Sequence, residues 1–337
     1  MNAHWFKSFV RPARARPRSR AGLASAAIVV ASLGANAQSG PIVAWGDILF
    51  SGDPLPTGLF SRVVAGNGHS LAMRPDGSIV TWGYGAPLGV PPPDQYLGLA
   101  AGFGHNCVIR SDGTLLCWGL NDSGQCNAPS GSFTRVAAGY RASAAIRSDG
   151  TIATWGFNSE IPPPSGAFKD IWVGKWWYLA QRTDDSLVAW GTDQFGVVST
   201  VPTGPFLTAT ASGSWFAYAL RYDGTIVHWG YNGDGVANVP AGAFVAVSGG
   251  EYGSLAVRPN GTVVCWGYGW FNENTPPGAR VMSASAGSLF GIGIAACYAN
   301  CDGSTADPFL NINDFVCYLN YFAAGEQYAN CDASTTP

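Results

Sequence analysis

Few side chains in this chain have the types and spacing that catalysis requires. After the first 37 residues the histidines are His69, His105 and His228. The sequence contains no zinc-spaced Cys/His cluster, no nucleophile elbow and no phosphate-cradling glycine motif. His69 and His105 share one position of an internal repeat, and His228 lies beside a tryptophan in an apolar run, which favours a structural role. We therefore expect no catalytic residues and a protein that is not an enzyme.

Oxygen-bearing side chains gather near the C-terminus. The segment Tyr298–Asp302 recurs as Tyr328–Asp332. Oxygen ligands at alternating positions, followed by a carboxylate that opens a helix ending at Gly325, are typical of a calcium loop. A small disulfide-stapled tail is the alternative interpretation. It would use Cys297, Cys301, Cys317 and Cys331.

A regular repeat organises the rest of the chain. Trp-Gly occurs seven times, and the steps between copies are 37, 36, 37, 35, 39 and 37 residues. The copies begin at Trp45, Trp82, Trp118, Trp155, Trp190, Trp229 and Trp266. A period of this size means that each unit buries its apolar face against its neighbours. Tryptophans at one repeated position are expected to pack one unit against the next.

Each repeat contains a glycine, a turn and the Trp-Gly strand at fixed spacing. Gly66 precedes the turn residue Asp76 by ten positions, and Trp82 follows that turn by six. Five of the six turns read Asp-Gly or Asn-Gly, which is a hairpin signal, whereas the fourth reads Asp184-Asp185. All variation in length falls in proline-bearing segments after Trp-Gly. We interpret each of these segments as a loop with a short outer fourth strand.

Repeated four-stranded units predict an all-β, seven-bladed β-propeller. The first copy, residues 41–46, has only the Trp-Gly strand, and the last copy, residues 280–294, lacks it. Pairing these two parts would complete the seventh blade and remove the exposed edges of an open array. The expected domains are a leader over 1–37, the propeller over 38–296 and a small helical, calcium-loop-like tail over 297–337.

These residues resemble the repeats of the regulator of chromosome condensation superfamily. The Ala-Gly, His-Ser, Asp-Gly and Trp-Gly pattern, with Val201-Pro202 and Val239-Pro240, is most similar to a secreted bacterial branch that includes a β-lactamase inhibitor protein. The resemblance covers about residues 41–296. It implies a propeller that binds a protein through loops rich in aromatic residues. The superfamily's namesake also suggests guanine-nucleotide exchange. A leader over residues 1–37 that is typical of export and an excess of acidic residues after it argue against that activity.

The C-terminal tail resembles a dockerin-type repeat. That resemblance implies calcium as a cofactor and a protein partner for the tail. The ligands that it implies are Asn300, Asp302, Ser304 and Asp314. The second copy is truncated, because the sequence stops at Pro337 before any helix.

Residues 1–37 are typical of a signal peptide. Six basic residues precede the apolar stretch Ala21–Leu33, and Ala35-Asn36-Ala37 indicates cleavage before Gln38. An uncleaved anchor is the alternative. Without this leader, 12 basic residues face 21 acidic ones, a net charge of −9. That balance disfavours nucleic acid as a partner. We expect a secreted or cell-envelope monomer with no membrane span after processing.

The eight cysteines fit an oxidising compartment. Cys107 and Cys117 flank the Ser111–Gly113 turn symmetrically, which places them opposite each other across a hairpin. We predict a disulfide between them. Cys265 occupies the position equivalent to Cys117, and its opposite residue is Leu255.

Two sets of loops should share one end of the propeller and form its binding rim. One set follows the repeat glycine and the other follows Trp-Gly. Aromatic residues there match the composition of interface hot spots, although some of these rings could fill gaps between blades. The predicted partner-binding residues are Phe103, Tyr140, Trp176, Trp177, Trp215, Tyr252, Tyr84, Tyr231 and Trp270. The same loops carry Arg141, Lys175, Phe157, Glu251 and Tyr268.

These features predict an exported, non-enzymatic protein that binds a protein or glycan partner at the rim and is attached elsewhere by its tail. The alternative is an extracellular enzyme acting on polysaccharide. In that case Asp122 or Asp193 at the rim would supply the acid.

Overall fold

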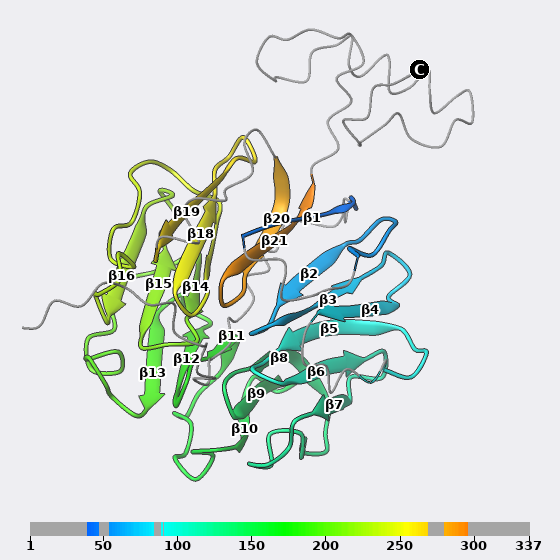
Figure 1. Cartoon of the computed structure of the whole chain (residues 1–337). Helices are drawn as coiled ribbons and strands as arrows, with labels where there is room; N and C mark the ends of the chain where they lie inside the picture. Colours follow the sequence, from blue (N-terminus) through cyan, green and yellow to red (C-terminus); the bar gives the residue numbers. More distant parts are fainter. Residues whose placement is uncertain (1–38, 47–53, 84–88, 90, 269–279, 296–337) are drawn as a thin grey trace, which may run out of the picture.

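The structure of the chain, a computed structural model, consists of β-strands joined by turns and loops (Figure 1). It describes residues 39–46, 54–83, 89, 91–268 and 280–295. These residues contain 21 strands in seven antiparallel sheets of three strands each. The prediction of an all-β fold is confirmed. Within the described residues, no helix is long and apolar enough to cross a membrane.

Six sheets are formed by consecutive strands, and the seventh combines the two ends of the repeat region. The consecutive sheets are β2 (Arg62–Ala65), β3 (His69–Met73) and β4 (Ile79–Gly83); β5 (Tyr96–Ala101), β6 (His105–Arg110) and β7 (Leu115–Gly119); β8 (Phe133–Ala138), β9 (Ala142–Arg147) and β10 (Ile152–Gly156); β11 (Phe168–Val173), β12 (Trp177–Arg182) and β13 (Leu187–Gly191); β14 (Thr208–Ala211), β15 (Phe216–Leu220) and β16 (Ile226–Gly230); and β17 (Ala246–Gly249), β18 (Gly253–Val257) and β19 (Val263–Gly267). The seventh contains β1 (Ile42–Gly46), β20 (Val281–Ala286) and β21 (Phe290–Ala295).

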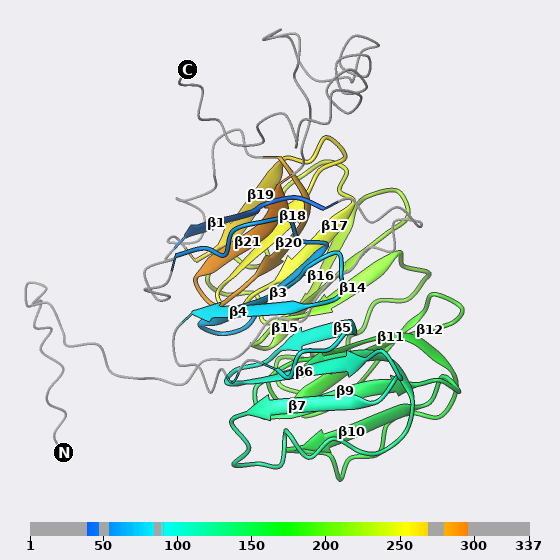
Figure 2. The same cartoon turned by 90° about the vertical axis from the view of Figure 1, so that its right-hand side faces the viewer.

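The seventh sheet closes the ring. β1 pairs antiparallel with β21, with Ile42 opposite Ile294 and Trp45 opposite Gly291. β20 contacts β2 on one side and β17 on the other, so the last sheet joins the first. Figures 1 and 2 show the sheets following one another around the molecule in chain order. The predicted pairing of residues 41–46 with the C-terminal repeat is therefore present.

The prediction of a fourth strand in each blade is wrong for the segments that the structure describes. The connections 120–132, 157–167, 192–207 and 231–245 form turns and irregular loops instead. Prolines and glycines in them prevent a regular ladder, because proline has no N–H to donate. These loops are nonetheless fixed in place. Trp155, Trp229 and Trp266 donate their indole N–H to the carbonyls of Gln125, Val197 and Val236, each in the loop of the preceding sheet.

The repeated glycines are explained by close approach and by backbone conformation. A Cβ on Gly66 or Gly102 would lie 2.7–2.8 Å from the carbonyl oxygen of the corresponding glycine of the next sheet. The glycine of each Trp-Gly has a positive φ, from +88° at Gly46 to +115° at Gly83. L-residues rarely adopt this conformation. Both glycine positions turn the chain into the loops at one end of the propeller.

The opposite end carries the hairpin turns, and their acidic residues have a structural role. In the first turn, Asp76 Oδ1 accepts hydrogen bonds from the Ser78 backbone N–H and hydroxyl. These bonds lower the pKa of the Asp76 carboxyl. The same arrangement occurs at Asp112, Asp149, Asp184, Asp223 and Asn260.

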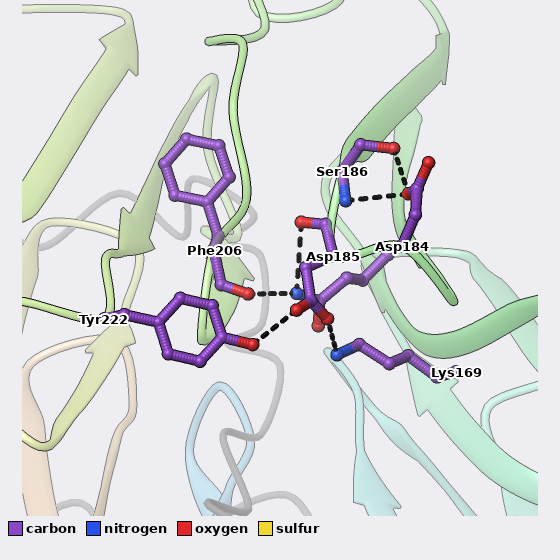
Figure 3. A network of polar contacts seen from close by, with 7 residues as sticks. Lys169, Asp184, Asp185, Ser186, Phe206 and Tyr222 are labelled. Atoms are coloured by element: carbon purple, nitrogen blue, oxygen red, sulfur yellow. Dashed lines mark hydrogen bonds and ion pairs between the residues drawn. The ribbon is translucent and has the colours of Figure 1, made fainter.

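The fourth turn departs from the pattern because Asp185 stands where the other turns have glycine. Asp185 adopts a φ of +71°. Figure 3 shows its carboxylate between Lys169 and Tyr222. Lys169 lies in the same sheet, and Tyr222 belongs to the hairpin turn of the next one. Asp185 therefore links two neighbouring sheets at this end of the molecule.

Candidate functional site

The loops after the repeat glycine and the loops after Trp-Gly meet at one end of the propeller. Backbone hydrogen bonds join them within each unit. The Thr192 N–H donates to the Trp176 carbonyl, and the Tyr231 N–H donates to the Trp215 carbonyl. The Tyr268 N–H donates to the Tyr252 carbonyl in the same way. The residues of both sets are thus held together, as the repeat pattern predicts.

An aromatic cluster, consisting of Phe103, Tyr140, Phe157 and Trp176, lies on this end. The ring centroids of Phe103 and Tyr140 are 4.7 Å apart, and those of Phe157 and Trp176 are 6.0 Å apart. Phe157 is 43% exposed, and the other three are partly exposed. Their residues come from the loops of three successive sheets, so the cluster crosses the boundaries between sheets.

Lys175 joins the two halves of the aromatic cluster. Its Nζ lies 5.5 Å from the Tyr140 ring centroid and 5.6 Å from that of Trp176. Arg141 lies over the Tyr140 ring and also pairs with Asp122 at 3.4 Å. A cation over an aromatic face is attracted by the ring's quadrupole. These contacts restrain the rings.

A pocket of about 150 Å³ lies beside the aromatic cluster. Most of the walls are aromatic, and the lining also includes two carboxylates and a serine. The lining residues are Phe195, Ser214, Trp215, Phe216, Tyr231, Asp234, Val236, Glu251 and Tyr252. The Trp215 ring contacts Trp176 with centroids 5.4 Å apart, so the pocket and the aromatic cluster are continuous.

The carboxylates of this pocket are held by hydroxyl groups. The Tyr231 hydroxyl donates to Asp234 Oδ2 at 3.2 Å, and the Ser288 hydroxyl donates to Glu251 Oε2 at 3.1 Å. Burial raises the pKa of Tyr252 to about 12, with smaller effects from the charges of Glu251 and Asp234. The pocket therefore combines two carboxylate side chains with aromatic walls.

Two predicted rim residues belong to the interior. Trp177 is completely buried, and its indole N–H donates to the Ser214 carbonyl of the next sheet at 3.1 Å. It is the first residue of β12, at the position that His69, His105 and Phe216 occupy in other sheets, and this position faces the neighbouring sheet. Placing Trp177 on the exposed rim was wrong. Trp215 is only 8% exposed, so it contributes a wall of the pocket rather than an open surface.

The remaining predicted partner-binding residues are divided by their positions. Phe103, Tyr140 and Trp176 form the aromatic cluster, whereas Tyr231 and Tyr252 line the pocket. Tyr84 and Trp270 lie outside the described residues, as do the predicted calcium ligands Asn300, Asp302, Ser304 and Asp314. Phe195 and Asp234 were not singled out from the sequence. Each lies five positions after the tryptophan of a Trp-Gly pair and is followed directly by a glycine. This shared spacing is the sequence signal that could have found them.

The histidines at the repeated position join neighbouring sheets. The Nε2 of His69 lies 2.8 Å from Asn106 Oδ1, and the Nε2 of His105 lies 2.8 Å from Ser143 Oγ. Burial lowers the pKa of both, to about 3 for His105. His228 Nε2 lies 2.9 Å from the Tyr231 carbonyl oxygen. All three therefore have structural partners.

Asp122 and Asp193, the candidate acids of a polysaccharide-acting enzyme, stabilise the loops in which they lie. Asp122 accepts a hydrogen bond from the Gln125 side chain and pairs with Arg141. Asp193 accepts hydrogen bonds from the backbone N–H groups of Val198 and Ser199. Across the described part of the chain, no three or more His, Cys, Asp or Glu residues are grouped as a metal site would require.

The hairpin register places Cys107 opposite Cys117, and a disulfide joins them. Cys265 stands opposite Leu255 in the equivalent hairpin. The Cys126 thiol donates to the Leu120 carbonyl, and burial raises its pKa to about 11. Cys126 is therefore a poor nucleophile near neutral pH.

Comparison with known proteins identifies the architecture. The model of the regulator of chromosome condensation (RCC1) repeat matches residues 98–125. The structure of yeast RCC1 (Prp20) bound to Kap60 superposes with a TM-score of 0.65 over 95% of this chain and 100% of that one, at 15% identity. The fold is that of an RCC1-like propeller.

Extracellular receptor domains have the same RCC1-like architecture. The entire ectodomain of the receptor kinase CR4 from Physcomitrella patens aligns at 22% identity over 70% of both chains, with a TM-score of 0.62. The CRINKLY WD40 ectodomain of ACR4 from Arabidopsis thaliana aligns at 21% identity over 70% of this chain and 93% of that one, also with a TM-score of 0.62. No curated protein matches in sequence. At these identities the likeness establishes the fold alone.

Proposed function

We propose that the chain is an exported, non-enzymatic binding protein whose aromatic end recognises a protein partner. The observation that carries this proposal is the aromatic cluster, which is partly exposed, continuous across sheets and restrained by Lys175. Aromatic residues on loops held by a rigid scaffold are typical of interface hot spots. Restraint before binding lowers the entropy that association costs.

The compared structures are consistent with a binding role. Yeast RCC1 is bound to Kap60 in one of them, and two others are ectodomains of receptor kinases. We extend only a general binding role to the present chain, because specificity depends on the loop residues themselves.

Export is supported by the leader and by the disulfide. Residues 1–37 have the pattern of a signal peptide. The Cys107–Cys117 bond would persist in an oxidising compartment outside the cytoplasm. Residues 297–337, which lie outside the described residues, would attach the protein to a second partner through a dockerin-like, calcium-binding tail.

Affinity capture with the mature protein tests the proposal. The bait would be residues 38–337, exposed to proteins and polysaccharides from the producing cell's surroundings. We expect a protein to be captured and the yield to fall at least tenfold for the double variant Phe157→Ala and Trp176→Ala. Equal capture by the folded double variant, or capture of polysaccharide alone, would contradict the proposal.

A matched control lies at the other end of the propeller. Leu97 is 55% exposed and follows Tyr96, whose N–H donates to the turn carbonyl of Gly77. Leu97→Ala therefore removes an exposed apolar side chain beside the hairpin turns. This variant should capture as much protein as the unchanged chain. Replacing Trp177 and Trp215 is unsuitable for this purpose, because both contribute to the hydrophobic core.

A further inference from the structure

The pocket beside the aromatic cluster combines aromatic walls with two carboxylates. Its walls include Phe195, Trp215, Tyr231 and Tyr252, and the ring centroids of Phe195 and Tyr231 are 5.1 Å apart. Asp234 and Glu251 supply carboxylates, and none of the described lining residues is basic. Aromatic faces and carboxylates both attract a cation, whereas an anion would be repelled by both.

Two of these side chains lie at backbone positions with a positive φ. Phe195 has a φ of 57° and Asp234 a φ of 56°. Aspartate adopts this region more often than most non-glycine residues, whereas a bulky residue such as phenylalanine seldom does. Each is followed by a glycine that also has a positive φ. The turns are fixed by backbone bonds such as that from the Val236 N–H to the Gly233 carbonyl. Backbone conformations of this kind persist where the surrounding structure enforces them, often at ligand sites.

The two carboxylates differ in exposure, with one near the surface and the other deeper, and this arrangement suits a side chain that enters from solvent. Glu251 is buried, with only 5% of its surface exposed, and Asp234 lies on an exposed turn. A long basic side chain could place its charged end near Glu251 while its stem lies against Trp215 and Tyr252. Asp234 at the mouth would attract the charge as it approaches.

We propose that this pocket binds a lysine or arginine side chain of the protein partner. The inference rests on the proposed function, because it identifies the chemistry of that partner. The contact between Trp215 and Trp176 makes the pocket continuous with the aromatic cluster. One partner surface could therefore place a basic residue in the pocket and apolar residues on the cluster.

Titration of the mature protein with small probes tests the pocket directly. The probes are the capped amino acids N-acetyl-lysine methylamide and N-acetyl-arginine methylamide, with N-acetyl-norleucine methylamide as the uncharged control. The readout is the NMR signal of the Trp215 indole N–H, assigned by comparison with Trp215→Phe. We expect saturable shifts with a basic probe and at least tenfold weaker binding of the norleucine probe. Absence of saturable binding by both basic probes, or equal binding of the norleucine probe, would overturn the inference.

Variants of the carboxylates identify their role. Asp234→Asn changes an exposed charge, and combining it with Glu251→Gln should weaken binding of the basic probe at least tenfold. Asp223→Asn is the matched control, because Asn260 already occupies the equivalent turn position in the sixth repeat. Undiminished binding by the folded Asp234→Asn, Glu251→Gln variant would also overturn the inference.

The outcome is separable from that of the proposed function. Capture of a protein partner without binding of a basic probe would leave the proposed function standing and would reject the pocket's role. Binding of a basic probe without capture of any protein would locate a cation site and reject the proposed function, on which the partner assignment rests.

Discussion

The indole nitrogen of Trp229 donates a hydrogen bond to the carbonyl oxygen of Val197 at 3.0 Å. Trp229 is in β16, and Val197 lies in the loop that follows the Trp-Gly of the preceding sheet. That loop also carries Phe195, a wall of the pocket. The repeated tryptophan therefore packs neighbouring sheets together and also fixes a loop at the end of the propeller that carries the aromatic cluster.

Trp229→Phe should loosen the loop that carries Phe195. Phenylalanine keeps an aromatic ring but leaves the Val197 carbonyl without its donor, at a cost of about 1–3 kcal/mol. We expect lower stability in urea unfolding and faster hydrogen exchange over residues 192–200. Trp118→Phe is the control for loss of ring size, because the buried Trp118 nitrogen has no hydrogen-bond partner among the described residues and Trp118 lies in a different sheet. Equal exchange in the two variants would show that the Trp229 bond does not hold the loop.

The protein should lose more stability when Asp185 is replaced by alanine than when it is replaced by glycine. Alanine removes the carboxylate from Lys169 and Tyr222 and retains a Cβ at a φ of +71°, whereas glycine also relieves the backbone strain. The left-handed conformation costs an L-residue about 1–2 kcal/mol, so Asp185→Gly should exceed Asp185→Ala in stability by about that amount. Thermal or urea unfolding of the two variants measures the difference. An Asp185→Ala variant as stable as Asp185→Gly would contradict this account.

Removing the Cys107–Cys117 disulfide should destabilise the propeller without changing its fold. A bond across a short hairpin restricts the unfolded chain, and a loop of this size corresponds to about 2–3 kcal/mol. The measurement is urea unfolding of the Cys107→Ala, Cys117→Ala variant beside the oxidised protein. Non-reducing mass spectrometry should find these cysteines joined and Cys126 available for alkylation after unfolding. A free Cys107 thiol in the native protein would contradict the structure.

Calcium binding by the tail is a prediction of the sequence alone. If Asp302 and Asp314 are ligands, replacing both with alanine should abolish calcium binding by the mature chain, since each contributes a negative charge to the site. Calorimetric titration with calcium measures this, and Asp223→Asn on the propeller is the control for loss of charge. Undiminished binding after both replacements would show that these residues are not the ligands.

The repeat made the fold predictable because the same backbone requirement recurs in every unit. Glycine is required at Gly46 and its equivalents because φ is positive there, and at Gly66 because a neighbouring carbonyl lies too close for a Cβ. The repeated glycines in the sequence therefore indicate these backbone features. The fourth strand was predicted wrongly because only the lengths and prolines of the loops, and no repeated strand pattern, suggested it. A sequence period reveals only those backbone conformations that recur in every repeat. Because the loops after Trp-Gly differ from one another, the period could not predict their structure.

The exposure of side chains at the end that carries the aromatic cluster could be predicted only in part. Trp176 and Trp177 are adjacent, yet Trp176 is partly exposed and Trp177 is buried, because side chains alternate as β12 begins. If the strand is expected to start one residue earlier or later, the predicted exposed and buried positions of these two tryptophans are exchanged. The pocket was missed because Phe195, Asp234 and Glu251 come from loops of different repeats, and only the packing of neighbouring sheets brings them together.

Acidification should destabilise the propeller through His105. Its pKa is about 6.5 when unfolded and is lowered to about 3 by burial in the folded protein, with a smaller effect from His69. The folded state therefore favours the neutral ring, so this contribution to stability is complete above pH 6.5 and is lost as the pH falls toward 3. The loss from one such histidine approaches about 1.4 kcal/mol per pH unit.

Urea unfolding between pH 7.5 and 4.5 measures the contribution of His105. His105→Gln should be less stable than the unchanged protein at pH 7.5, since it disturbs the contact with Ser143, but should lose less stability on acidification. His69, whose pKa burial also lowers, accounts for part of the remaining slope. Below pH 6, Asp170 acts in the opposite direction, because burial raises its pKa to about 6 and protonation favours the folded state. Identical pH slopes for the two proteins would show that His105 does not resist protonation in the folded chain.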